Sequence, residues 1–335
     1  AEELMEIHSA EGLEIKIVTP RQVYNEFSSG NPDVTAIKMM MKMLYDRADG
    51  NPDLRPKYLQ IIGDGTFMNK LSSDNSSYVI TYQSGNSISP TSSYVSDDYY
   101  AFLDDSTSEA LGDAMDIGVG RIPCEDLEQA KGYVNKVKRY LSGNTSSDGG
   151  AYCLGDQEGS PYGSWRNIIC LVSDDMDGNG GPTESIHMSN SDEHANTIYS
   201  EHNDFDVVKL YMDAYQQVST PGGERYPDGA EAINQRVQNG ALIVNYIGHG
   251  GERGFAHERI LNIPTIQSWT NINRLPVFMT ATCELARFDD PEFRSAGELI
   301  VMNPNGGAIA MLTTTRIVFS GSNQQLNRAF FDIAL

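Results

Sequence analysis

Long apolar runs and basic charge are both scarce in this sequence of 335 residues. No run approaches the roughly 20 consecutive apolar residues of a membrane-spanning helix, and the first residues lack the basic-then-apolar order of a secretory signal. Lys and Arg number 24 against 46 Asp and Glu, a formal net charge of −22. Such a surface repels the phosphates of nucleic acid and anionic lipid headgroups. We therefore expect no nucleic-acid partner and no membrane span in this chain.

Cysteine is also rare, with four residues in the whole chain: Cys124, Cys153, Cys170 and Cys283. They form no CxxC pair and no zinc-finger spacing. Cys170 lies inside an apolar run, where we expect it to pack as a small hydrophobe. The sequence leaves open whether Cys124 and Cys153 pair or are free. Cys283 is treated below.

The length is sufficient for two packed units. In the first part we expect a strand over Leu13–Val18, a helix capped by Asp33 that ends near Gly50, strands at Tyr58–Ile62, Tyr78–Tyr82 and Asp116–Val119, and an amphipathic helix over Glu125–Leu141. Residues 142–150 have the Ser, Gly and Asn content of a surface linker. We place the boundary there, with subdomains at 1–142 and 143–335.

The second part alternates strands and helices. The predicted elements are strands at 167–173, 206–210, 241–247, 275–282 and 307–313, and helices at 192–200, 228–239, 264–269, 295–302 and from 322. Alternation of this kind predicts a mainly parallel sheet with helices on its faces and right-handed crossovers. The fold class is therefore α/β, and functional side chains should follow the strands that end at Ser173, Ile247 and Ala281.

Two of these strands end in residues suited to covalent chemistry. The run Ala241–Ile247 breaks into Gly248, His249 and Gly250, and the run Leu275–Thr282 ends at Cys283. A thiolate is a nucleophile, and an imidazole moves protons near neutral pH. The N–H groups of Gly250 and Cys283 would be available to a developing oxyanion. The alternative is an inert buried thiol beside a structural histidine, but two adjacent strand ends favour a site.

An acidic loop follows the first of the three strands. Asp175, Asp177 and Asn179 reproduce the D-x-D-x-N opening of a calcium loop. The twelfth position is Ile186 rather than Glu, so this is no EF-hand, and Glu184 is a candidate in its place. The alternative is a solvated acidic turn. Nearby, His257 and Glu258 follow the glycine loop and are placed to line a cleft.

Several short stretches resemble one family of enzymes. The Gly-His-Gly and Ala-x-Cys strand ends are similar to those of caspase-like cysteine peptidases. The stretch 245–250 resembles the gingipain family, and 280–284 with 287–291 and 295–298 resembles its PorU branch, the sortases of type IX secretion. Residues 62–65 and 118–123 also match that family. The resemblance covers nearly the whole chain.

The resemblance implies a gingipain-like fold of two abutting α/β subdomains and a Cys283 nucleophile with His249 as acid and base. It implies removal of C-terminal sorting domains from secreted cargo, and transfer of the new terminus to an amine of lipopolysaccharide. Other outer-membrane secretion components would be partners, at the cell surface of a Gram-negative bacterium. No cofactor is needed for the chemistry, but structural Ca²⁺ is plausible, since gingipain-like domains bind calcium.

Three points stay open at this stage. In gingipains an acidic residue after the first strand lies beside the catalytic histidine, so Asp174 or Asp175 is a candidate to orient His249, with a solvated turn as the alternative. The chain opens without Met and ends inside an amphipathic pattern, which predicts a fragment of a longer protein. The rival functions are a broadly acting secreted endopeptidase and a non-catalytic surface assembly module of the same fold.

Overall fold

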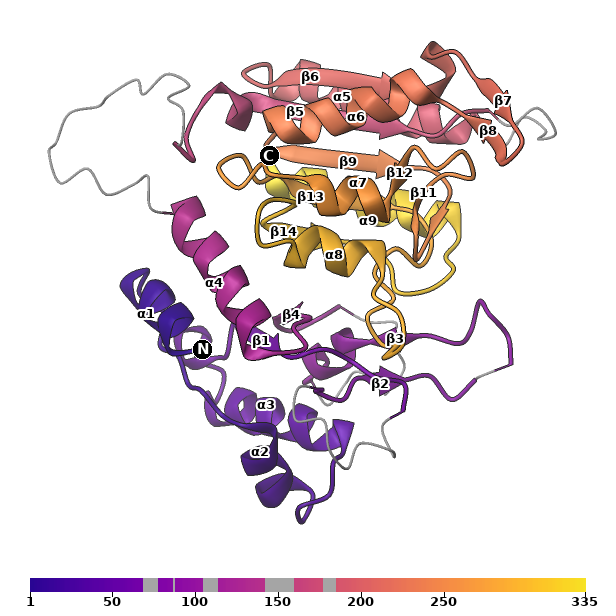
Figure 1. Ribbon diagram of the computed structural model, residues 1–335. Helices are drawn as coiled ribbons and strands as arrows, with labels where there is room; N and C mark the ends of the chain where they lie inside the picture. Colours follow the sequence, from indigo (N-terminus) through magenta and orange to yellow (C-terminus); the bar gives the residue numbers. More distant parts are fainter. Residues whose placement is uncertain (69–77, 87, 105–113, 142–159, 177–184) are drawn as a thin grey trace, which may run out of the picture. The chain divides into compact units, whose positions relative to one another are not determined.

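The computed structural model describes residues 1–68, 78–86, 88–104, 114–141, 160–176 and 185–335 (Figure 1). The chain divides into two compact units. Unit 1 comprises Ala1–Val134 and Phe288–Phe293, and unit 2 comprises Asn135–Arg287 and Arg294–Leu335. The division falls inside helix α4, Leu127–Leu141, slightly before the boundary that we placed at 142/143. The linker predicted at 142–150 lies outside the described residues.

Unit 1 is built around two parallel strands covered by helices. Its elements are α1 (Glu2–Ala10), α2 (Pro20–Phe27), α3 (Val34–Arg47), η1 (Pro52–Leu54), β1 (Tyr58–Ile62), β2 (Tyr82–Gln83), β3 (Val95–Ser96), η2 (Asp97–Ala101), β4 (Gly118–Ile122) and the first turns of α4. As predicted, Asp33 caps α3 by accepting the Thr35 N–H at 2.8 Å. The unit's main core joins the apolar faces of α2 and α3 to β1 and η2.

One predicted strand is absent from unit 1. Residues 13–18 form no strand, although apolar and polar residues alternate there, and Ile17 and Val18 are exposed. Strand β1 pairs only with β4 in the described residues, so this stretch has no ladder to join. The strand predicted at Tyr78–Tyr82 is reduced to a bridge between Asp64 and Tyr78 and the two-residue β2.

Arg121 at the end of β4 ties together the loops of unit 1. Its guanidinium pairs with Asp97 at 2.6 and 2.8 Å and donates to the carbonyls of Gly63 and Val79. It also lies 4.8 Å from the ring centroid of Phe288, in the segment that returns from unit 2. That segment is further held by the Phe67 N–H, which donates to the Asp289 carbonyl at 2.8 Å.

Unit 2 contains a five-stranded sheet whose strands are all parallel, in the order β14-β13-β9-β5-β6. The strands are β5 (Ile168–Ser173), β6 (Asp206–Tyr211), β9 (Ile243–Ile247), β13 (Val277–Ala281) and β14 (Ala310–Leu312). Short hairpins add β7 (Val218–Thr220) and β8 (Gly223–Arg225), and also β10 (Gly250–Gly251), β11 (Gly254–Phe255) and β12 (Leu261–Asn262). Two short 3-10 turns, η4 (Ser164–Asn167) and η5 (Met212–Ala214), complete the connections.

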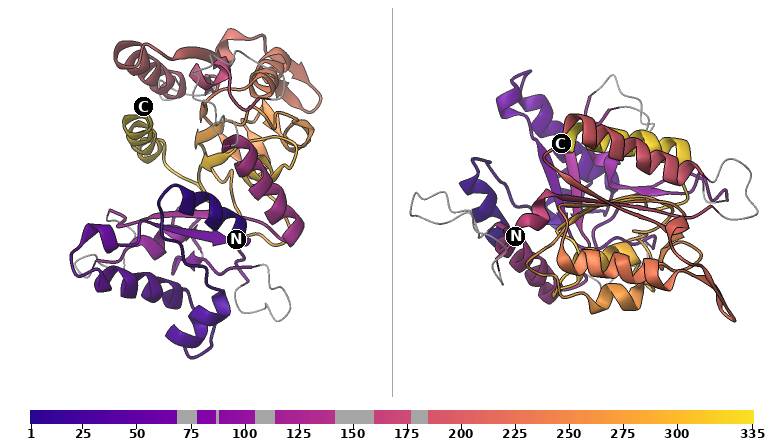
Figure 2. Two further views of the ribbon diagram at one scale, coloured as in Figure 1. Left: turned by 90° about the vertical axis from the view of Figure 1, so that its left-hand side faces the viewer. Right: turned by 90° about the horizontal axis from the view of Figure 1, so that it is seen from above.

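Helices cover both faces of this sheet, as Figure 2 shows from above. They are α5 (Ile186–Glu201), α6 (Pro227–Asn239), α7 (Ile263–Ser268), α8 (Ala296–Met302) and α9 (Ser320–Ala334). Successive residues of a strand point to opposite faces. Ile169 and Leu171 accordingly pack with α5 and α9, whereas Cys170 and Val172 pack with α6, α7 and α8.

The predicted strands and helices of unit 2 are all present, with one marked difference in extent. Helix α5 begins at Ile186, before the predicted start at Asp192, so Asp192 lies inside the helix instead of at its N-terminus. Because both faces of the sheet are covered, its central strands are mainly apolar. The exception in β9 is Asn245, which is buried and donates to the Met279 carbonyl and to Asn327 Oδ1. No helix in the described ranges is long and apolar enough to cross a membrane.

Candidate active site

Three neighbouring strands of unit 2 end at the same level. Ser173 of β5 is in register with Ile247 of β9, and Ile247 is in register with Ala281 of β13. The residues that follow, Asp174, Gly248 and Thr282, therefore leave one carboxyl edge side by side. The Asp174 N–H donates to the Ile247 carbonyl at 3.1 Å, and the Gly248 N–H donates to the Ala281 carbonyl at 3.3 Å. His249 and Cys283 thus follow adjacent strands at one edge of the sheet.

The turn that carries His249 is held from both sides through its backbone. The His249 N–H donates to Asp174 Oδ2 at 2.8 Å, and the Tyr246 hydroxyl donates to the His249 carbonyl at 2.5 Å. Tyr246 is fully buried, and its ring stacks on Phe255 at 3.9 Å. A Cβ on Gly248 would lie 2.4 Å from Asp174 Cβ, so only glycine fits there. The His249 side chain itself is exposed.

Cys283 lies on a tight, well-braced turn. Glu284, the next residue, has a φ of 51°, a left-handed conformation that residues other than glycine seldom adopt. The Glu284 N–H donates to the Arg316 carbonyl at 3.2 Å, and the Thr314 hydroxyl donates to the Thr282 carbonyl at 2.5 Å. The half-buried Cys283 thiol has a weak contact of 3.9 Å with the Val318 carbonyl. The turn reverses the chain sharply at the thiol.

Gly250 packs against the residue before Cys283. A Cβ on Gly250 would lie 2.4 Å from Thr282 Oγ1. The Ala256 N–H donates to the His249 carbonyl at 2.9 Å, so the next pair of the hairpin, Gly250 with Phe255, is a non-hydrogen-bonded pair. The Gly250 N–H consequently points away from β11. The N–H is therefore not used within this hairpin, and the oxyanion role of Gly250 stays a prediction.

Asp174 reaches the backbone of His249 rather than its imidazole. Its other oxygen, Oδ1, accepts the Asp175 N–H at 3.2 Å. The pKa of Asp174 is raised to about 7: burial is the largest cause, the bond from the His249 N–H opposes it, and the nearby carboxylates of Asp175 and Glu258 add to the rise. We predicted that Asp174 orients the His249 ring. In this arrangement Asp174 holds only the backbone N–H of His249, so it would act on the ring through the main chain.

Three buried carboxylates gather beneath this turn: Asp174, Asp175 and Glu258 each offer an oxygen within 4.8 Å of the others. Oxygen ligands of this kind suit a hard divalent cation. Asp175 also accepts the Tyr226 hydroxyl at 2.6 Å. Of the other calcium ligands predicted from the sequence, Asp177, Asn179 and Glu184 lie outside the described residues.

Two further histidines contact the His249 ring. His187, in the first turn of α5, meets it edge-on, with ring centroids 5.2 Å apart and planes at 83°. His257, after β11, stacks against it with centroids 5.4 Å apart and planes at 21°. The sequence placed His257 near a cleft but gave no reason to notice His187, because that contact depends on where α5 begins.

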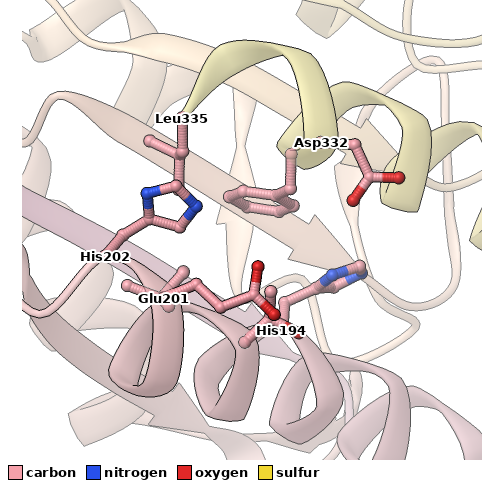
Figure 3. Close-up of a pocket in the computed structure, with 8 residues that line it drawn as sticks. His194, Glu201, His202, Asp332 and Leu335 are labelled. Atoms are coloured by element: carbon pink, nitrogen blue, oxygen red, sulfur yellow. The ribbon is translucent and has the colours of Figure 1, made fainter.

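The remaining thiols are unlike Cys283. Cys124 and Cys170 are both buried, and burial raises the pKa of Cys170 to about 12, as its predicted core position implies. Cys153 lies outside the described residues. A cavity of about 380 Å³ lies elsewhere in unit 2, between α5 and α9 (Figure 3). Its lining includes His194, Glu201 and Asp332 and none of the site residues predicted from the sequence.

A model of Peptidase family C25 matches residues 1–335. The fold is similar to that of the Arg-specific cysteine proteinase gingipain R (TM-score 0.62, 16% identity, 93% of this chain and 59% of that chain). It is also similar to the complex of Porphyromonas gingivalis RgpB pro- and mature domains (TM-score 0.63, 15% identity, 96% and 61%). No curated protein matches the sequence.

A match to dimeric latent PorU from Porphyromonas gingivalis is partial: 32% identity and a TM-score of 0.35, over 41% of this chain and 14% of that chain. It carries no argument about the fold. The family match, by contrast, spans every residue, so the chain belongs to Peptidase family C25, the gingipain family of cysteine peptidases. The predicted gingipain-like α/β fold is confirmed. The chain spans about three fifths of the gingipain structures, 59% and 61%.

Proposed function

We propose that this chain is the catalytic part of a cysteine peptidase that works as a sortase. Cys283 would be the nucleophile and His249 the acid and base. The observation that carries the proposal is the placement of these residues after β9 and β13, adjacent parallel strands in register from Ile243–Val277 to Ile247–Ala281. Ligands of open α/β sheets bind at this edge.

The chemistry proceeds through a thioester. The Cys283 thiolate bonds to the scissile carbonyl carbon, and the carbonyl oxygen becomes an oxyanion held by the N–H groups of Gly250 and Cys283. The C–N bond then breaks, and His249 gives its proton to the leaving amine. An amine, or water, next attacks the thioester and loses a proton to His249. The C–S bond breaks, and the thiolate is restored.

We propose further that the substrate is type IX secretion cargo bearing a C-terminal sorting domain, and that the acceptor is an amine of lipopolysaccharide. The protein would act on the outer face of the outer membrane with the other secretion components there. The support for this finer function is the likeness of 280–284 and 287–291 to PorU sequences. A secreted endopeptidase would use the same two residues, so the substrate distinguishes the two functions.

The first experiment measures cleavage of cargo carrying its sorting domain, with casein as the competing substrate, by the full-length protein. Cys283→Ala and His249→Ala should each lower kcat/KM for cargo at least about 10³-fold. Casein digestion with intact cargo would favour the endopeptidase instead. Turnover unchanged in Cys283→Ala would contradict the proposed nucleophile, and cleavage of neither substrate by the wild-type protein would favour a non-catalytic assembly module.

A second experiment compares Cys283 with Cys170, which is 1% exposed. The nucleophile should react with iodoacetamide at least about 10²-fold faster than the buried thiol, because reactivity follows thiolate content and access. Equal labelling of the two thiols would contradict the assignment of Cys283.

The oxyanion role of Gly250 has a matched control in its neighbour. Gly250→Ala places a Cβ 2.4 Å from Thr282 Oγ1, whereas a Cβ on Gly251 meets nothing within 4 Å. We expect Gly250→Ala to lower kcat about 10²-fold and Gly251→Ala to leave it unchanged. Adding Thr282→Ala to Gly250→Ala removes the clash and should restore part of the lost kcat. Equal effects of the two single variants would exclude a special role for Gly250.

Calcium binding by Asp175, Asp177, Asn179 and Glu184 stays a prediction, and we propose it as a structural site only. Titration of the full-length protein with Ca²⁺, followed by thermal unfolding, measures it. A rise in Tm that is lost in Asp177→Ala would support the loop. A rise that survives in Asp177→Ala but is lost in Glu258→Gln would assign the ion to the buried carboxylates.

A further inference from the structure

The imidazole of His249 needs a fixed direction, and its main chain does not supply one. Asp174 and Tyr246 fix the backbone N–H and carbonyl of His249. The side chain remains exposed, and an exposed side chain normally exchanges among staggered rotamers. Acid–base catalysis requires the ring nitrogen to face the reacting atoms within hydrogen-bond reach.

Two contacts act on the ring itself. His187 touches it edge-on at 5.2 Å, and His257 covers a face at 5.4 Å. One contact is T-shaped and the other is stacked, so the two neighbours oppose different displacements of the His249 ring. Edge-to-face and offset-stacked arrangements at such distances are favourable for aromatic rings.

Both partner rings are carried by segments that packing or backbone hydrogen bonds anchor, although the His257 side chain is itself exposed. His187 lies in the first turn of α5, whose Ala195 and Ile198 pack fully buried against the sheet. His257 follows Ala256, whose N–H donates to the His249 carbonyl and whose φ is 59°. The left-handed turn at Ala256 returns the chain beside His249. Next to His257, Glu258 is buried, which anchors the end of the turn.

We propose that His187 and His257 are positioning residues that hold the His249 imidazole in its catalytic rotamer. The proposal rests on the catalytic role proposed above for His249. Neither residue needs to touch substrate, because each acts through the ring that it contacts. The two histidines lie 70 residues apart in the chain. Each contacts the His249 ring because α5 and the β10–β11 hairpin begin at the same edge of the sheet.

The test measures kcat and KM separately for His187→Ala and His257→Ala in the full-length protein, all variants being assayed at the same fixed Ca²⁺ concentration. We expect kcat to fall about 10- to 100-fold, the scale of a small misplacement of a catalytic group, with KM within about twofold. His257→Phe keeps a flat ring against the same face and should recover most of the loss. His202→Ala, a half-buried histidine at the far end of α5, is the matched control and should keep wild-type kcat.

A second readout does not depend on turnover. With ¹³C at histidine Cε1, relaxation reports the order of the His249 ring, whose signal is assigned from its loss in His249→Gln. Ring order should fall in both alanine variants and return in His257→Phe. Unchanged kcat and unchanged ring order in His187→Ala and His257→Ala would overturn the proposal. Equal turnover of wild type and His249→Ala, with ring order still dependent on His257, would instead overturn the catalytic role of His249.

Discussion

Each unit of the molecule buries charge, and the two do so in opposite ways. In unit 1, Arg121 is paired with Asp97 and capped by backbone carbonyls. Burial alone lowers the pKa of Arg121, but the charge and hydrogen bonds of Asp97 raise it overall. In unit 2, Asp174 is buried beside Asp175 and Glu258, which are also acidic, and its pKa rises. The first charge is compensated, and the second group is pushed towards its neutral form.

This difference between compensated and uncompensated burial indicates a structural role for Arg121 and a place in the functional site for Asp174. A buried ion with a complete set of partners fixes the loops around it, and removing it leaves the partner charge alone. Carboxyl groups whose pKa values are strongly perturbed by burial and by like charges cluster at functional sites. Asp174 supports the His249 turn directly, which agrees with that tendency.

The largest effect is expected when the compensated charge is removed. Arg121→Met leaves Asp97 buried without its partner and several carbonyls without a donor. We expect a loss of about 3–5 kcal/mol in the free energy of unfolding, measured by chemical denaturation. Arg121→Lys keeps the charge but cannot make the two parallel hydrogen bonds of a guanidinium. Its free energy of unfolding should lie between those of wild type and Arg121→Met. A loss below about 1 kcal/mol for Arg121→Met would show that the buried Arg121–Asp97 pair does not hold unit 1 together, and the contrast with Asp174 would fail.

The next effect concerns the uncompensated carboxyl. The pKa of Asp174 is about 7 in the folded protein, above its ordinary value of 3.8, so the folded state holds the proton more tightly. Its stabilising contribution is present below about pH 4 and is lost as the pH rises through 7. Each pH unit between the two values corresponds to about 1.4 kcal/mol, which sets an upper value of about 4 kcal/mol.

Asp174→Asn should therefore have a flatter dependence of stability on pH than wild type in denaturant titrations, although it loses one of the two oxygens that accept the His249 and Asp175 N–H groups. Asp206, which is exposed at the start of β6, supplies the control: Asp206→Asn should keep the wild-type pH dependence. The contrary result would be a free energy of unfolding that rises between pH 5 and 8 equally in wild type and in Asp174→Asn. It would mean that the pKa of Asp174 is not raised by folding.

A smaller effect is expected from one neighbour of that group. Glu258→Gln removes a negative charge that raises the pKa of Asp174. The pH at which the stabilising contribution of Asp174 is lost should therefore fall. The effect on the pH dependence of stability should be smaller than that of Asp174→Asn. Carboxyl ¹³C shifts followed against pH measure it directly. No movement in Glu258→Gln would leave burial and the charge of Asp175 as the causes of the raised pKa of Asp174.

The smallest effect belongs to charges that neither unit buries. Lys209 pairs with Asp192 at 2.6 Å, with 33% and 49% of the two side chains exposed. Lys209→Met should change the free energy of unfolding by less than about 1 kcal/mol, and high salt should reduce the difference further. A loss comparable to that of Arg121→Met would mean that pairing, not burial, decides the cost.

The sequence predicts those features that local pattern determines. Strands β9 and β13 are apolar runs bounded by Gly and Pro, so their ends, and with them His249 and Cys283, could be located directly. The contact of His187 with His249 could not, because it depends on α5 starting at Ile186 and not at Asp192. Residues 13–18 have the alternating pattern of a strand but form none. A strand also needs a neighbouring strand to pair with, and that depends on residues distant in the sequence.

The return of Phe288–Phe293 to unit 1 has a consequence for dissecting the protein. A single cut in the gene cannot yield both halves intact. A piece ending at Val134 loses the aromatic ring that lies over Arg121 and the carbonyl that accepts from Phe67. The complementary piece keeps those groups on a loop only a few positions beyond Cys283, without the surface to which they bind. Fragments prepared for crystallisation or for swapping between relatives should therefore retain both units on one polypeptide.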